Sequence, residues 1–220
     1  MRKVKFINGE YYHIYNRGVD KRTIFERQED IDRFFLSMKE FNVLDPIGSI
    51  YEEILRRNKF GDLVSKKENL VEFVCYCLNP NHYHFILKQL VEEGIRKFMH
   101  KVSLGYTMFF NKEYKRNGSL FQGPFKAIHI GSNEYLLHLS AYVNLNYKVH
   151  NLEKFGHRVS KLFKSSWNEY INNNKEEKGF CKKDIISDQF GSPLDYKEFA
   201  EDSLERIREN KQIKKFLLED

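Results

Sequence analysis

The chain has 220 residues and a mass of 26.5 kDa, which fits one domain with a modest appendage. Its 37 Lys and Arg residues outweigh 31 Asp and Glu residues, and aromatic residues reach 15%. This balance favours a nucleic-acid partner, because cations bind phosphates and flat rings stack on bases. No run of 18 apolar residues and no apolar leader occurs, so we expect no membrane span. Three cysteines, two of them only two residues apart, do not form a disulfide framework, which favours the cytoplasm.

Hydrophobic periodicity and turn residues divide the first 150 residues into seven elements. In chain order, the pattern predicts a strand at 10–16, a helix at 28–42, a hairpin of strands at 71–78 and 82–89, a helix at 91–114, a strand at 120–130 and a helix at 133–149. The first six have the β-α-β-β-α-β order of the ferredoxin-like split βαβ arrangement, an α+β fold. We therefore expect an antiparallel sheet with both helices on one face and the other face free for a ligand or another helix.

The hydrophobic pattern weakens after residue 150. Residues 151–220 are predicted to be a C-terminal extension with one charged helix at 195–218, whose contacts are Phe199, Leu204 and Ile207. We expect this extension to pack on the domain formed by residues 1–150.

The sharpest local feature is His82-Tyr83-His84, directly after the turn Asn79-Pro80-Asn81. Residues two apart on a strand point to the same face, with α-carbons roughly 6.6 Å apart. Two imidazoles placed in this way can converge on one metal ion. The alternative is a pair of half-exposed histidines without a ligand.

A second feature lies on the predicted helix 133–149. His138, Tyr142, Asn146 and Val149 recur every three or four residues and so share one stripe. The stripe lies beside the expected core positions Leu136, Leu139 and Val143. A tyrosine hydroxyl and an amide one turn apart could face a common site. The alternative is an amphipathic stripe that is half exposed to solvent.

Positive charge concentrates in residues 95–126, which contain seven basic residues and one acidic residue, Glu113. The basic residues are Arg96, Lys97, Lys101, Lys112, Lys115, Arg116 and Lys126. Interleaved aromatic residues would suit phosphate contacts with occasional base stacking. A solvated helix face explains the same charge equally well.

Cys75 and Cys77 offer a rival metal site. A hairpin loop of two or four residues would put them on the face of His82 and His84, where a Cys2His2 zinc site could form. A loop of three or five residues would turn them to the other face as small core residues. We favour the core, because Cys-x-Cys is not the usual zinc spacing.

Together these features resemble the HUH-superfamily single-tyrosine transposases of the insertion-sequence type, most nearly the REP-associated tyrosine transposases. The likeness is carried, in chain order, by YHIYNRG at 12–18, CYCLNPNHYHFIL at 75–87, GSLFQGPFK at 118–126, EYLLHLSAYVNLN at 134–146 and SSWNEY at 165–170. The His-x-His hairpin followed by the Tyr-x-x-x-Asn helix is specific only as a pair. In this family Cys75 and Cys77 stand at small apolar positions. Residues 43–69 are longer than the usual link, which indicates an insertion.

The resemblance implies a metal-dependent enzyme that cleaves and rejoins single-stranded DNA, beside a hairpin, through a 5′-phosphotyrosine intermediate. His82, His84 and Asn146 would hold Mg²⁺ or Mn²⁺, and Tyr142 would be the nucleophile. The expected DNA contacts are Arg17, Lys97, Lys101, Lys112, Lys115, Arg116 and Lys126. Such an enzyme would be associated with the nucleoid.

Three alternatives remain open at this point. The chain could be a non-catalytic regulator that binds hairpin DNA and derives from a transposase. It could be an RNA-binding ferredoxin-like module, although the basic-Gly-aromatic strand signature of RNA-recognition domains is missing. It could also be a nuclease that uses water and forms no covalent adduct. A homodimer is a further open partner, since the tyrosine could serve the histidines of its own chain or of a second copy.

Overall fold

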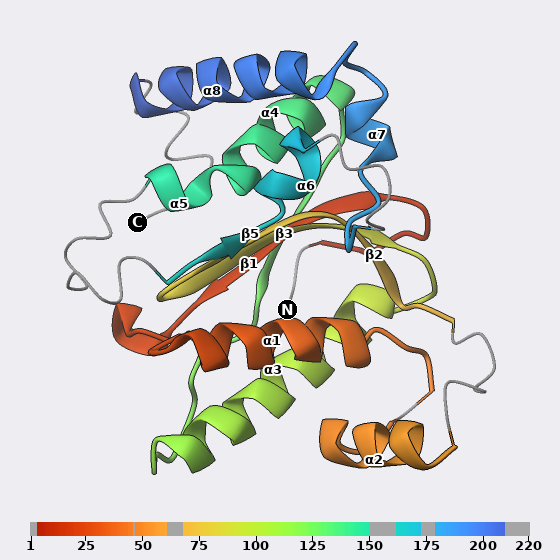
Figure 1. Cartoon of the computed structure of the whole chain (residues 1–220), viewed down its shortest axis with the longest axis vertical. Helices are drawn as coiled ribbons and strands as arrows, with labels where there is room; N and C mark the ends of the chain where they lie inside the picture. The colour runs from red at the N-terminus through yellow and green to blue at the C-terminus, as the bar shows by residue number, and fades with distance from the viewer. Residues whose placement is uncertain (1–3, 46, 61–67, 150–161, 173–178, 210–220) are drawn as a thin grey trace.

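The computed structural model describes residues 4–45, 47–60, 68–149, 162–172 and 179–209 (Figure 1). At its centre lies a five-stranded sheet whose paired strands are all antiparallel, in the order β4-β1-β3-β2-β5. The strands are β1 (Tyr11–Arg17), β2 (Val71–Asn79), β3 (His82–Gln89), β4 (Lys126–His129) and β5 (Lys164–Ser165). The first four strands have the order 4-1-3-2, so the predicted ferredoxin-like α+β fold is confirmed.

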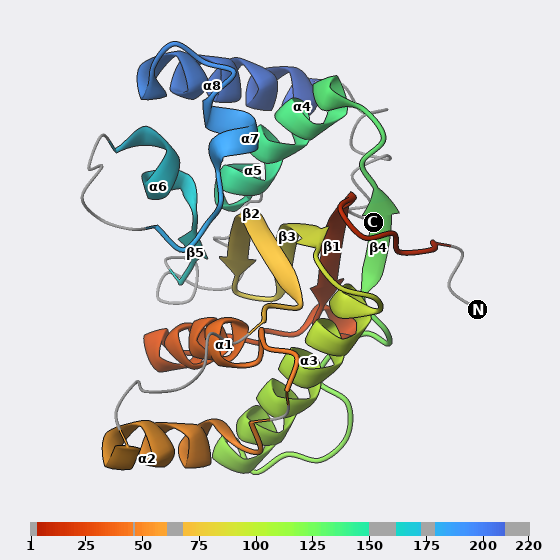
Figure 2. The same cartoon turned by 90° about the vertical axis from the view of Figure 1, so that its right-hand side faces the viewer.

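Helices cover both faces of the sheet (Figures 1 and 2). On one face lie α1 (Gln28–Glu40) and α3 (Gly94–Glu113), as the split βαβ order predicts. On the other lie α4 (Asn133–Asn144), α5 (Asn146–Val149), α6 (Trp167–Ile171), α7 (Asp184–Ser187) and α8 (Pro193–Glu209). A short 3-10 helix, η1 (Val19–Lys21), follows β1, and α2 (Ile50–Phe60) lies apart from the sheet within the expected insertion. No helix in the described ranges is long and apolar enough to cross a bilayer.

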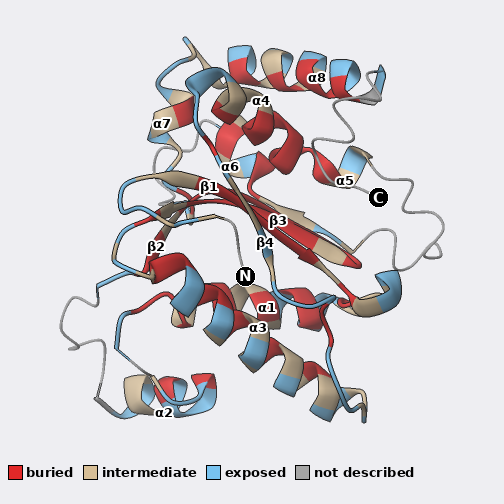
Figure 3. Cartoon of the chain, turned by 180° about the vertical axis from the view of Figure 1, so that it is seen from behind, coloured by how far each residue is buried: buried red, intermediate tan, exposed pale blue. Residues whose placement is uncertain are grey.

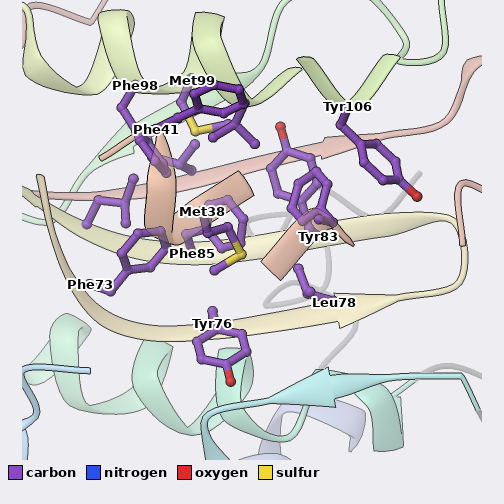
Figure 4. Close-up of a cluster of buried hydrophobic side chains, with 14 of the residues drawn as sticks. Met38, Phe41, Phe73, Tyr76, Leu78, Tyr83, Phe85, Phe98, Met99 and Tyr106 are labelled. Carbon is purple, nitrogen blue, oxygen red and sulfur yellow. The ribbon is translucent and has the colours of Figure 1, made fainter. Parts of the chain in front are cut away.

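The first hydrophobic core, the α1/α3 cluster, fills the space between the sheet and these two helices (Figure 4). Alternate strand residues such as Tyr12, Tyr83 and Phe85 point into it and meet Phe34 of α1 and Phe98 of α3. Figure 3 shows buried residues along the central strands and on the inner sides of the helices, since helices cover both faces of the sheet. The other strand residues must therefore face the second helical layer.

The second core, the α4/α8 cluster, joins the C-terminal part of the chain to the sheet. Leu136, Leu139 and Val143 are buried in it as predicted, together with Leu204 and Ile207 of α8. Phe199 packs on its margin and is partly buried.

A buried network of hydrogen bonds also ties α8 to α4. The Asn144 side-chain amide donates to the Tyr196 hydroxyl at 2.9 Å, and that hydroxyl lies 3.1 Å from Ser140 Oγ. The Ser166 hydroxyl donates to Asn144 Oδ1 at 2.6 Å and accepts from the backbone N–H of Tyr76 at 2.9 Å. This network fixes the end of α4 against both α8 and the sheet.

Three predicted boundaries differ in the structure. The expected strand 120–130 is reduced to β4, because Gly123 has φ +71° and Pro124 follows it, so the chain turns there. The expected helix 133–149 breaks at Leu145, which has φ −104° and ψ 12° and separates α4 from α5. The last helix starts at Pro193, and the predicted part beyond residue 209 lies outside the described residues.

Candidate active site

The site is built on the β2–β3 hairpin, whose loop has only two residues, Pro80 and Asn81. His84 is paired with Tyr15 of β1 and with Cys77 of β2, while His82 is paired with Arg17 and Asn79. Directly paired residues point to the same side of an antiparallel sheet. Because Tyr83 points into the α1/α3 cluster, both histidines point to the layer that contains α4. We call this side of the sheet the histidine face.

The cysteines lie on the histidine face, so our expectation that they face the other way is wrong. The two-residue loop sets Cys77 opposite His84 and Cys75 opposite Ile86. Both are fully buried in the α4/α8 cluster, as expected for core residues. Burial raises the pKa of Cys77 to about 12 and that of Cys75 well above its usual range, which keeps the thiols protonated and disfavours metal binding. In the described part of the chain, no three His, Cys, Asp or Glu side chains form a cluster suited to a metal ion.

Asn146 meets His82 directly. Its Oδ1 lies 2.9 Å from His82 Nε2, and its side chain is fully buried. The break at Leu145 gives Asn146 the first position of α5, immediately above the end of the hairpin. Two groups that can act as electron-pair donors thus converge, as sequence reasoning anticipated for a metal site.

Asn79 also belongs to this site, although the sequence did not single it out. Its amide nitrogen lies 2.9 Å from His82 Nε2 and 2.5 Å from Asn146 Oδ1. The N–H₂ group of Asn79, which carries partial positive charge, therefore lies between His82 Nε2 and Asn146 Oδ1. A metal cation at this position would contact the lone pairs of the same two atoms. The two-residue loop pairs Asn79 with His82, but the sequence left the loop length open and so gave no clear signal for Asn79.

Tyr142 lies against the histidines of its own chain. Its ring centroid is 5.5 Å from that of His84, with the ring planes at 84°. The side chain of Tyr142 has no exposed surface. The predicted stripe therefore points into the site and not to solvent. His138, at the N-terminal end of this stripe, is half-buried, and its Nδ1 lies 3.0 Å from Ser203 Oγ, outside the site.

A third histidine, His13 of β1, completes the cluster and was missed by sequence reasoning as a site residue. It is fully buried, and its Nε2 lies 2.9 Å from His84 Nδ1. Burial lowers the pKa of His13 to about 3, so the ring is neutral at physiological pH. His13 sits four residues before Arg17 on the same strand, so the alternation of β1 predicts that both share the histidine face.

The predicted DNA contacts separate into two groups on opposite sides of the sheet. Arg17 is paired with His82, and its guanidinium donates to Gln122 Oε1; Lys126 is exposed and is paired with Tyr15. Both lie on the histidine face. The remaining predicted contacts lie on α3 or directly after it, in the layer on the other side: Lys97, Lys101, Lys112, Lys115 and Arg116.

Two members of the α3 group are engaged within the protein. Lys101 Nζ donates to the backbone carbonyl of Val43 at 2.7 Å, and burial lowers its pKa. Arg116 donates to Asn111 Oδ1, also at 2.7 Å. The run of positive charge in the sequence is therefore not one surface in space.

One segment of the chain, residues 51–146, matches a known protein family. This segment matches the IS200-like transposases. The resemblance inferred from the sequence is thereby confirmed. The match spans less than half of the chain, but it includes the hairpin, α4 and the first residue of α5.

Two solved structures resemble the chain at low identity. One is a REP-associated tyrosine transposase bound to a REP hairpin, with 13% identity, a TM-score of 0.43, and coverage of 69% of this chain and 74% of the other. The second is a tRNA(His) guanylyltransferase from Saccharomyces cerevisiae, with 10% identity, a TM-score of 0.34, and coverage of 91% and 74%. Neither likeness bears on activity. No curated protein matches the chain.

Proposed function

We propose that this protein is a metal-dependent transposase that cleaves and rejoins single-stranded DNA through a covalent bond to Tyr142. The IS200-like segment supports a transposase role. The observation that carries the finer proposal is the convergence, within one chain, of Tyr142 on His84 and of Asn146 on His82. The substrate we propose is single-stranded DNA beside a hairpin, at the nucleoid.

The spacing of two donor atoms fits a small six-coordinate divalent cation. Mg²⁺ holds its ligands at 2.0–2.1 Å in an octahedron, so neighbouring ligand atoms lie about 3.0 Å apart. His82 Nε2 and Asn146 Oδ1 are 2.9 Å apart, close to that spacing. We propose that these two groups and His84 hold Mg²⁺ or Mn²⁺. When bound, such an ion polarises the scissile phosphate and offsets the charge on its oxygens.

Tyr142 is the proposed nucleophile because it contacts His84 and lies four residues before Asn146. Its phenol would lose a proton, its oxygen would bond to phosphorus, and the P–O3′ bond would break to leave a 3′-hydroxyl. The phosphotyrosine conserves the bond energy, so a 3′-hydroxyl of another strand can reverse the step. Since Tyr142 is fully buried, its hydroxyl reaches a phosphate only after a local movement of its side chain or of α4.

Around this centre, the proposed DNA contacts on the histidine face are Arg17 and Lys126. Lys126 is exposed, and its Nζ lies 5.8 Å from the centroid of the Tyr15 ring. The Tyr15 ring in turn stacks on the rings of His13 and His84. A phosphate that approaches the histidines from this edge of the sheet would meet positive charge there. The lysines of α3 belong to the layer on the other side of the sheet, so we propose that they do not contact the same phosphates.

The proposal is tested with Tyr142→Phe, which removes one oxygen and retains the ring. The variant should lose both strand cleavage and the protein–DNA adduct that survives boiling in detergent, measured on a labelled hairpin oligonucleotide with a single-stranded flank. The matched control is Tyr135→Phe on the same helix, which should form the adduct normally.

Three results would contradict the proposal in different ways. An adduct that persists in Tyr142→Phe would identify another nucleophile. Cleavage without any adduct in the unaltered protein would indicate a nuclease that uses water. Hairpin binding without cleavage, with Mg²⁺ or Mn²⁺ present, would indicate the non-catalytic regulator.

A further inference from the structure

His13 and His84 form a hydrogen-bonded pair of imidazoles inside the protein. Their nearest nitrogens are 2.9 Å apart and their ring planes differ by only 18°, which suits an in-plane N–H···N bond. Tyr142 stands across both rings, at 87° to His13 and 84° to His84, and the Tyr15 ring lies nearly parallel to both. The orientation of His84 is therefore fixed from several sides.

The shared hydrogen bond constrains the position of the protons. Each neutral imidazole carries one N–H, and only one of the two facing nitrogens can donate. If His84 Nδ1–H donates to His13 Nε2, the lone pair of His84 lies on Nε2. If His13 Nε2–H donates instead, the proton of His84 is on Nε2, and that nitrogen cannot bind a cation. The two arrangements have the same number of protons and differ in tautomer. In the first, the proton of His13 lies on Nδ1, a buried nitrogen with no hydrogen-bond partner among the described residues; in the second, Nδ1 carries a lone pair.

We propose that His13 is a positioning residue that accepts a hydrogen bond from His84 Nδ1–H and so directs the Nε2 lone pair of His84 to the metal. This inference rests on the metal site proposed above. Histidines that bind metals are generally oriented by an acceptor at their second nitrogen, and loss of that acceptor typically lowers metal affinity 10- to 100-fold. A buried histidine in a strand otherwise suited to an apolar residue is consistent with this role.

The first test measures Mn²⁺ affinity by electron paramagnetic resonance of the free ion, without DNA. His13→Leu should weaken binding roughly 10- to 100-fold. His13→Gln should retain most of the affinity, because its amide oxygen can accept near the original Nε2 position. His138→Leu is the matched control, since His138 is a half-buried histidine of α4 that bonds to Ser203 outside the site. Urea unfolding of each variant establishes that it is folded.

The second test reads the tautomer of His84 from the ¹⁵N shifts of its ring nitrogens in the metal-free protein. The unaltered chain should show a protonated Nδ1, and His13→Leu should give a mixture of tautomers. His84 protonated on Nε2 in the unaltered chain, both with and without Mn²⁺, would overturn the proposal.

The two proposals fail in distinguishable ways. If His84→Ala abolishes Mn²⁺ binding but folded His13→Leu binds like the unaltered chain, only the role of His13 is wrong. If His84→Ala itself binds Mn²⁺ normally, the proposed metal site is wrong, and the inference about His13 fails with it.

Discussion

The polar network between α4 and α8 gives a quantitative prediction for Tyr196→Phe. Ser140 Oγ donates to the Leu137 carbonyl at 2.7 Å, so the Tyr196 hydroxyl must donate to Ser140 and accept from Asn144. Ser140 and Asn144 are fully buried and Tyr196 is 2% exposed. The substitution leaves the Asn144 amide without this acceptor and opens almost no cavity. An unsatisfied buried donor costs about 1–3 kcal/mol, so the free energy of unfolding should fall by that amount.

Urea unfolding followed by tryptophan fluorescence is the appropriate assay. Trp167 is the only tryptophan, and its ring centroid lies 6.1 Å from that of Tyr196, so the signal reports on this cluster. For a chain of this size, each kcal/mol corresponds to about 2–4 °C in Tm. Tyr51→Phe, at a residue 70% exposed on α2, is the control and should change stability by less than about 0.5 kcal/mol. A change equally small in Tyr196→Phe would refute the reasoning.

Three further predictions concern the metal, the DNA and the thiols. Asn146→Asp, which adds a charge 2.9 Å from His82 Nε2, should tighten Mn²⁺ binding roughly tenfold by calorimetry; unchanged affinity would argue against Asn146 as a ligand. Lys126→Gln should weaken binding to all single-stranded DNA sequences and reduce the salt slope by about one in anisotropy titrations, whereas Lys97→Gln, on the other side of the sheet, should not; equal effects would contradict this division. The three cysteines are buried and their pKa values are raised, so none should react with a thiol reagent at pH 8 until urea is added. As the pH rises, the thiols of the unfolded chain lose their protons before those of the folded chain, so their contribution to stability should be present below pH ~9 and decline above it. The urea midpoint should therefore be lower at pH 10 than at pH 8. A midpoint that does not fall would refute this prediction.

The fold was predictable because each element has its own periodicity and its own turn. The stripes of α1, α3 and α4 are helical, and Asn79-Pro80-Asn81 separates two apolar strands. The break between α4 and α5 was not predictable, since Tyr147, Lys148 and Val149 continue the helical pattern after Leu145. Packing of Asn146 over the hairpin decides that break, and packing is not a local property.

Two residues of the site could not be predicted from the sequence, for the same reason. Asn79 and His13 enter it through strand pairing, which depends on the length of the hairpin loop and on the register of β1 against β3. The predicted DNA contacts show the converse case, because residues of one sequence stretch lie in different layers. Lys97 and Lys126 belong to the same basic stretch of the sequence, but Lys97 lies on α3 and Lys126 lies on β4, the edge strand of the sheet. Proximity along a chain that crosses a sheet does not imply a common surface.

Because the chain has two hydrophobic cores, these cores can form at different times during synthesis on the ribosome. The fully packed, buried members of the α1/α3 cluster precede residue 122, apart from Cys181, whereas the α4/α8 cluster needs residues as late as Ile207. At 5–20 residues per second, synthesis of the residues between these two positions takes on the order of ten seconds. During that time α4 lacks α8, which packs on its outer side, so apolar residues of the α4/α8 cluster are exposed. Chaperone binding should therefore concentrate in this interval, and α4 acquires its full support only after Ile207 has been synthesised.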